Sequence, residues 1–152
     1  MTLDMPFVVD TNVLARLGRT RVATAFFRKN ARIPEEIKYE SRGLPEIFEL
    51  QENVYLTTAT VLSHLAKVLK TIDTGDTELI DLYRNEGNAD PFVVACALDG
   101  QSQSEHMLFT DEWIVVTDDN AVRGKAQEFG IKVLCYEEFA LLIDDSQDAD
   151  SS

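Results

Sequence analysis

The sequence has few of the residues that build disulfides or zinc sites. Its 152 residues include two cysteines and two histidines. Cys96 and Cys135 stand far apart in apolar stretches rather than in a CxxC pair, so we expect both to be reduced core residues. His64 and His106 have no partner at ligand spacing. A soft metal site for zinc is therefore not expected.

Long apolar runs are also missing, although the hydrophobic content of 45% is normal for a globular protein. No run approaches the roughly 20 residues that a membrane-spanning helix needs. No basic segment leads into an apolar stretch at the N-terminus. We therefore expect a cytoplasmic protein with no membrane partner, and the length matches one ordinary domain with its own core.

Positive charge is scarce, because 14 basic residues against 27 acidic ones give a net charge of −13. This balance argues against a protein that holds nucleic acid by bulk electrostatics. The charge is uneven, however. The polar end DDSQDADSS predicts an acidic disordered tail over residues 144–152. Between Thr11 and Pro34 there is no acid, and a basic face is compatible with the six cations there, which are Arg16, Arg19, Arg21, Arg28, Lys29 and Arg32.

Short runs of β-forming residues alternate with segments of helical periodicity. The runs 7–10, 113–117 and 132–135 are typical of buried parallel strands, and 31–33 is a further short one. Residues 1–143 are therefore predicted to form one α/β domain, with helices on both faces of a mostly parallel sheet. The helical segments are 13–17, 22–28, 35–41, 45–50, 59–72, 77–84, 92–98, 121–129 and 137–143.

Carboxylates stand where several of these elements meet. Asp10 ends the first strand, Asp118 and Asp119 follow the strand WIVVT, and Asp90 opens the helix that begins PFVVACAL. Because ligands of α/β sheets bind at the carboxyl ends of the strands, we expect these acids to gather at one edge. Each has an ordinary alternative as a helix N-cap. For Glu40, in PEEIKYES, the alternative is a solvated helix face.

Together the acids indicate a divalent cation. Carboxylates within a few ångströms repel one another by roughly 1 to 4 kcal/mol per pair, and a cation relieves that repulsion. An oxygen-only ligand set suits Mg²⁺ or Mn²⁺. Because no evident pair of histidines could serve as acid and base, cleavage of a phosphodiester here would depend on metal-activated water.

Four segments resemble, in order, the acidic motifs of the PIN-domain nuclease family, which includes the VapC-like toxin ribonucleases. They are FVVDTNVLARL at 7–17, IPEEIKYE at 33–40, NADPFVVACAL at 88–98 and VVTDDNAVRGKAQEFGIKVL at 115–134. The first and last are the most specific. The second is the weakest, so Glu36 or Glu46 is an alternative to Glu40. The resemblance covers the chain to about Ile143.

The resemblance implies a three-layer α/β/α sandwich, one or two divalent ions and hydrolysis of RNA. It assigns catalysis to Asp10, Glu40, Asp90 and Asp119. Asp10 and Asp90 would hold the principal ion, and Glu40 would orient the attacking water. Asp119 would complete the site or bind a second ion, and Asp118 is an extra acid that could share the metal.

Two polar neighbours are expected to support these acids. Asn12 and Thr117 would hydrogen-bond the carboxylates and fix their rotamers. A turn or capping role is the alternative for Asn12.

RNA contacts are expected from basic residues that flank the acids in sequence, with a solvated basic face as the alternative for each. Phe26 and Phe27 are predicted to be core residues rather than a base-stacking platform. Small members of the family are often the toxin of a toxin–antitoxin pair, so an antitoxin protein is an expected partner beside RNA, and a homodimer is compatible with this picture. The RNA-binding candidates are Arg16, Arg19, Arg21, Arg123 and Lys125.

Two other functions are compatible with parts of the pattern. One is a non-catalytic PIN fold that binds RNA or a protein. The other is a phosphatase of the haloacid-dehalogenase type, which also starts with a strand ending in aspartate. That class has a second aspartate two residues later, where this chain has Asn12.

Overall fold

The computed structural model describes residues 5–36, 50–71, 90–105 and 112–150. The strands are β1 (Phe7–Val9), β2 (Ala31–Pro34), β3 (Val54–Tyr55), β4 (Ile114–Val116) and β5 (Lys132–Leu134). The helices are α1 (Thr11–Val22), α2 (Ala25–Asn30), α4 (Ala59–Lys70), α6 (Asp90–Ser104), α7 (Asn120–Glu128) and α8 (Tyr136–Asp150). None of the helices in these ranges is long and apolar enough to cross a membrane.

The strands form one five-stranded sheet in the order β3-β2-β1-β4-β5, and every neighbouring pair is parallel. In the centre, Val8 of β1 lies opposite Val115 of β4 and Arg32 of β2. This confirms the prediction of an α/β domain with a parallel sheet. The two-residue strand β3 has no counterpart in the sequence prediction.

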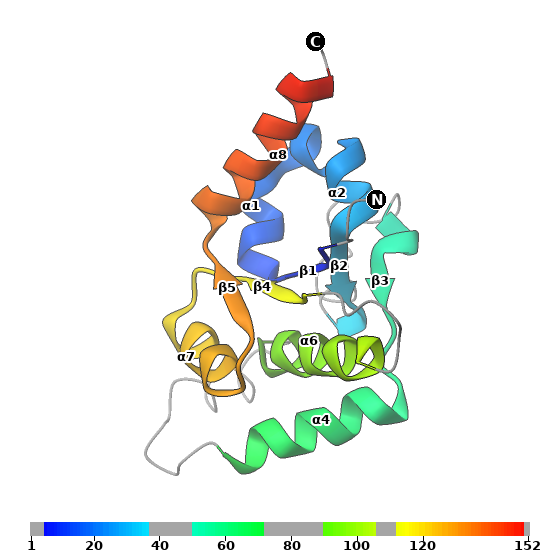
Figure 1. Ribbon diagram of the computed structural model, residues 1–152, viewed down its shortest axis with the longest axis vertical. Coiled ribbons are helices and arrows are strands. Elements are labelled where there is room, and N and C mark those ends of the chain that lie inside the picture. The colour runs from blue at the N-terminus through cyan, green and yellow to red at the C-terminus, as the bar shows by residue number, and fades with distance from the viewer. Residues whose placement is uncertain (1–4, 37–49, 72–89, 106–111, 151–152) are drawn as a thin grey trace.

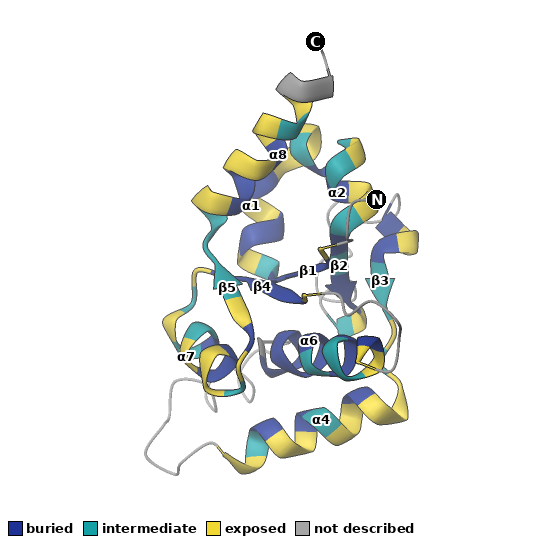
Figure 2. Ribbon diagram, in the orientation of Figure 1, coloured by how far each residue is buried: buried dark blue, intermediate teal, exposed yellow. Residues whose placement is uncertain are grey.

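Helices cover both faces of the sheet (Figure 1). Helices α1, α2 and α8 pack together on one face, while α6 and α7 cover the other and α4 lies on the outer side of α6. This arrangement is compatible with a three-layer α/β/α fold. Strands β1 and β4 are buried on both faces, as Figure 2 shows, which explains why FVV and IVV are unbroken apolar runs.

An aromatic cluster fills the space between β1, α2 and α8. Phe7 and Phe139 are buried, with ring centroids 5.0 Å apart, and Phe26 and Phe27 each lie 6.3 Å from Phe139. Burying one such ring contributes about 1.5–3 kcal/mol. Phe27 is therefore a core residue, as predicted, and Phe26 is partly buried and packs against the core.

The opposite face is packed around α6. Gly100 lies so close to the Trp113 ring that a Cβ atom there would collide with the indole. Cys96 is buried in the same helix, whereas Cys135 is partly exposed, and both are free thiols. The prediction of a core position is therefore confirmed for Cys96 and wrong for Cys135.

Several helix boundaries differ from the prediction, since α1 covers Thr11–Val22 instead of 13–17 and α6 covers Asp90–Ser104 instead of 92–98. Helix α8 continues through residues 144–150, where the sequence predicts a disordered tail. Those residues contain no glycine or proline, and Asp144 is tied to α1 by an ion pair with Arg21. The segment 22–28 is interrupted, because α1 ends at Val22 and Thr24 caps α2 by accepting a hydrogen bond from the Phe27 N–H.

Several predictions fall outside the described residues. These are the helix at 77–84, most of the helices at 35–41 and 45–50, and the loop that contains His106. His64 is described, on α4, where its Nε2 lies 3.9 Å from the buried Asp99 carboxylate.

Candidate active site

The strand order places a topological switch point at the carboxyl ends of β1 and β4. From β1 the chain passes through α1 and α2 to β2 on one face, whereas from β4 it passes through α7 to β5 on the other (Figure 1). Where neighbouring strands send their connections to opposite faces, the strand ends leave a ligand-binding crevice. Asp10 follows β1 directly, and residues 117–119 follow β4.

Asp10 is buried at this point, with 1% of its surface exposed. It is the N-cap of α1, and its Oδ1 accepts a 2.7 Å hydrogen bond from the Thr11 N–H. Its Oδ2 accepts a 2.8 Å hydrogen bond from the Thr117 hydroxyl. The Asp10 N–H donates to the Val116 carbonyl at 3.0 Å, which continues the β1–β4 pairing into the site.

Thr117 is fully buried and joins the two loops. Its hydroxyl donates to Asp10 and accepts a 3.1 Å hydrogen bond from the Asp119 N–H. The hydrogen bond to a site carboxylate that the sequence predicts for Thr117 is therefore present. Asn12, by contrast, is exposed on the first turn of α1.

Asp119 is the N-cap of α7. Its Oδ1 accepts hydrogen bonds from the N–H groups of Ala121 at 2.8 Å and Val122 at 3.3 Å. Helices α1 and α7 thus both begin at these strand ends, and the partial positive charge of their N-termini favours anionic groups there. The same field stabilises the Asp10 and Asp119 carboxylates and would favour a phosphate group.

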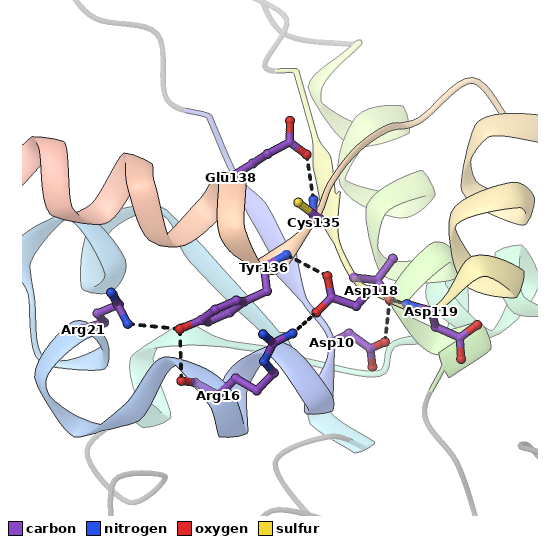
Figure 3. A network of polar contacts seen from close by, with 9 residues as sticks. Asp10, Arg16, Arg21, Asp118, Asp119, Cys135, Tyr136 and Glu138 are labelled. Atoms are coloured by element: carbon purple, nitrogen blue, oxygen red, sulfur yellow. Dashed lines mark hydrogen bonds and ion pairs between the residues drawn. The ribbon is translucent and has the colours of Figure 1, made fainter.

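Asp118 is held from the other side. Its Oδ2 accepts a 2.6 Å hydrogen bond from Arg16 Nη1, and its Oδ1 accepts one of 2.9 Å from the Tyr136 N–H. The Arg16 guanidinium lies over the Tyr136 ring, 4.1 Å from its centroid. Figure 3 shows Arg16 approaching Asp118 while the Asp119 side chain points away toward α7.

The structure describes the remaining predicted acids only in part. Asp90 is the first residue of α6, a helix that packs against β1 and β4, but its side chain is not described. Glu40 and its alternative Glu46 lie outside the described residues, and Glu36 is half-buried just after β2. Among the side chains that are described, no three of the His, Cys, Asp and Glu residues form a metal-binding group.

The predicted RNA-binding residues have different surroundings. Arg16 and Arg21 are engaged in ion pairs, with Asp118 and Asp144 respectively. Arg19 is exposed, and Arg123 is half-buried, with an Nε that finds no hydrogen-bond partner in the described part of the chain.

Lys125 is buried rather than facing an open surface. Its Nζ bonds to the carbonyl and hydroxyl of Thr71 at 3.3 and 3.1 Å and to Glu128 at 2.7 Å. It joins α7 to the end of α4, which is a structural role.

Sequence reasoning missed Tyr136, which contacts Asp118 and Arg16 and whose hydroxyl accepts a 3.1 Å hydrogen bond from Arg21. The sequence contains a local signal for a helix start beside Tyr136, because Glu138 stands three residues after Cys135. In the structure Glu138 accepts a hydrogen bond from the Cys135 N–H at the start of α8, and this bond lowers the pKa of Glu138. The pattern marks the beginning of a helix next to a strand end.

A second polar cluster, between α6 and β3, was also missed. The buried Asp99 accepts hydrogen bonds from the Tyr55 hydroxyl at 2.6 Å and from Gln103 at 2.8 Å. Burial, followed by the bond to Asp99, raises the pKa of Tyr55. The signal was an acid inside the apolar run ACALDG.

No protein-family model matches the chain, and no curated protein is significantly similar to it. The resemblance to PIN-domain nucleases stays a prediction that rests on the four motifs.

Proposed function

We propose that this protein is a divalent-metal-dependent ribonuclease with a PIN-like fold, which hydrolyses RNA phosphodiester bonds at the carboxyl ends of β1 and β4. The observation that carries the proposal is the buried Asp10 carboxylate, held by the Thr117 hydroxyl at the point where the strand connections diverge. The order of the acidic motifs along the chain supports it.

The environment of Asp10 suits a metal ligand. A carboxylate that is 1% exposed keeps its charge only where hydrogen bonds or a cation stabilise it. The Thr11 N–H and the Thr117 hydroxyl bind one oxygen each and so fix the orientation of the carboxylate. A ligand held in one rotamer by its hydrogen-bond partners is typical of metal sites.

The candidate donors fit a hard cation, because the residues that follow these two strands, Asp10, Asp118 and Asp119, are all carboxylates. We propose that Asp10, Asp90 and Asp119 hold Mg²⁺ or Mn²⁺, with Glu40 beside the attacking water. A bound ion of this kind lowers the pKa of a coordinated water and stabilises charge on the phosphate. The N-termini of α1 and α7 would add a favourable field for the anionic substrate.

The test is the substitution Asp10→Asn. Asparagine keeps an acceptor for the Thr117 hydroxyl but removes the charge. We expect cleavage of single-stranded RNA in Mn²⁺ to fall at least about a hundredfold, as it does when a catalytic group is lost. Asp145→Asn, which removes an exposed acid from α8, should leave the rate unchanged. Wild-type protein that binds no divalent ion and cleaves no RNA in a broad panel would contradict the proposal.

The proposal extends to the biological role of a toxin with an antitoxin partner. Induced expression of the wild type should then arrest growth of the host cell, and Asp10→Asn should relieve the arrest. Growth that is equally unaffected by both proteins would argue against a toxin role while leaving the nuclease assay to decide the chemistry.

A non-catalytic binding module is the second candidate, and one observation favours it. Asp118 and Asp119 already serve as an ion-pair partner and a helix cap, which are roles that need no metal. Titration with Mn²⁺ in a calorimeter separates the candidates, since the nuclease should bind the ion with an affinity that Asp10→Asn abolishes.

A further inference from the structure

Arg16 stands at the edge of the candidate site in a fixed orientation. Its guanidinium stacks on Tyr136 and donates to Asp118, the residue next to the Thr117 that bonds to Asp10 (Figure 3). Its side chain is still 53% exposed, against 32% for Asp118. Solvent, and any ligand that enters from solvent, therefore reaches this arginine.

The partner of Arg16 has the chemistry of a phosphate. A guanidinium donates to the paired oxygens of a carboxylate and of a phosphodiester in the same way. Asp118 Oδ2, 2.6 Å from Arg16 Nη1, occupies a place where a non-bridging phosphate oxygen could bind. Stacking on Tyr136 orders the arginine beforehand, which lowers the entropy cost of binding a ligand.

Asp118 can release Arg16 without losing its place in the structure. Its other oxygen accepts from the Tyr136 N–H, so the turn after β4 keeps an anchor to α8 when the ion pair opens. Ion pairs as exposed as this one are weak. A phosphate that arrives beside the N-termini of α1 and α7 would compete well for the arginine.

We propose that Asp118 is an internal competitor of the substrate, and that Arg16 exchanges the Asp118 carboxylate for a phosphodiester of single-stranded RNA bound at the site. The inference rests on the proposed function, because it describes how the same site receives its substrate. It predicts that the Asp118 carboxylate weakens RNA binding, because Arg16 must leave this carboxylate before it can bind a phosphate.

Asp118→Asn tests the exchange directly. The asparagine carbonyl still accepts from the Tyr136 N–H, while its amide no longer attracts Arg16. The probe is a fluorescein-labelled oligouridylate of about 12 nucleotides, within the length that single-strand-binding sites cover. Anisotropy is measured in EDTA and low salt, so that cleavage does not interfere. We expect the affinity to rise about two- to fivefold, the free-energy range of an exposed ion pair.

A double-mutant cycle separates the exchange from the general loss of a negative charge. Arg16→Gln should weaken binding, and Asp118→Asn should add no gain in that background. Asp145→Asn on α8 and Lys67→Gln on α4 match the two charge changes away from the site. Thermal melting checks that each variant is folded.

The outcomes are distinct. The inference is overturned if Asp118→Asn binds RNA no more tightly than Asp145→Asn does. It is also overturned if Asp118→Asn raises the RNA affinity equally in the Arg16→Gln background, or if no variant binds RNA. If that happens while Asp10→Asn abolishes metal-dependent cleavage, the proposed function stands alone. If the affinity rises as expected but no RNA is cleaved, the exchange stands and the nuclease does not.

Discussion

At the scale of single residues, the site depends on one hydroxyl. Thr117 donates to the buried carboxylate of Asp10 and accepts from the N–H of Asp119, so it fixes the strand end of β1 against the cap of α7. Its burial leaves no water to replace these bonds. Loss of this hydroxyl would therefore remove one hydrogen bond to Asp10 after β1 and one to Asp119 after β4.

Thr117→Val should lower the free energy of unfolding by about 1–3 kcal/mol, the cost of leaving a buried polar group without one of its partners. Valine has nearly the same shape, so packing is preserved while the hydroxyl is lost. Urea unfolding measures the loss. Thr117→Ser keeps the hydroxyl and should cost much less, and equal losses in the two variants would show that the hydrogen bonds contribute little.

At the scale of elements, α8 is tied to α1 by charged groups. Arg21 donates to both oxygens of Asp144, at 3.1 and 3.0 Å, and also to the Tyr136 hydroxyl. The hydrogen bond from Arg21, followed by its charge, lowers the pKa of Asp144, and the same bond raises the pKa of Arg21. The helix therefore depends on pH for part of its attachment.

The sign of that dependence follows from the lowered pKa of Asp144. Stabilisation is fully present above the ordinary pKa of 3.8 and disappears as the pH falls through the lower value of the folded protein. Asp144→Asn should therefore lower the urea midpoint at pH 7 but leave it unchanged at the lowest pH at which the protein still folds. Asp145→Asn, the exposed neighbour, is the control, and a deficit for Asp144→Asn that stays constant down to low pH would contradict the assignment.

Local patterns predicted most of the elements that position the site. The runs that end at Asp10 and before Asp118 mark strands because they are apolar and short, and the caps at Asp10 and Asp119 mark helix starts. The two-residue strand β3 is too short for any period to appear.

Contacts between segments that are distant in the chain could not be predicted from the sequence. Arg16 and Asp118 are 102 residues apart, and their pairing depends on the β1–β4 register and on the position of α8. Lys125 looked like a surface cation because its burial depends on Thr71, in a segment that only the fold brings to α7.

At the scale of the whole molecule, the two cysteines differ in how deeply their thiols are buried. Burial, followed by the charge of Asp99, raises the pKa of Cys96 to about 12, whereas Cys135 is partly exposed between β5 and α8. The thiolate is the form that reacts with alkylating reagents. Cys96 in the native protein should therefore react only when α6 opens.

We expect iodoacetamide at pH 8 to modify Cys135 of the native protein first and to reach Cys96 only in urea, as peptide mass spectrometry would show. The rate at Cys96 should rise in parallel with global unfolding, since the helix packs against the centre of the sheet. Equal rates at both cysteines in native buffer would contradict the burial of Cys96. Cys135→Ser removes the fast site and isolates the slow one.

The bond between Thr117 and Asp10 joins residues 107 positions apart, and β1 pairs with β4 across the same interval. Parallel pairing over such a distance forms late, because a long loop must close before the contact stabilises it. During synthesis Asp10 therefore leaves the ribosome long before Thr117 has been added. The arrangement around Asp10 cannot assemble until β4 and Thr117 have followed it, 107 residues later.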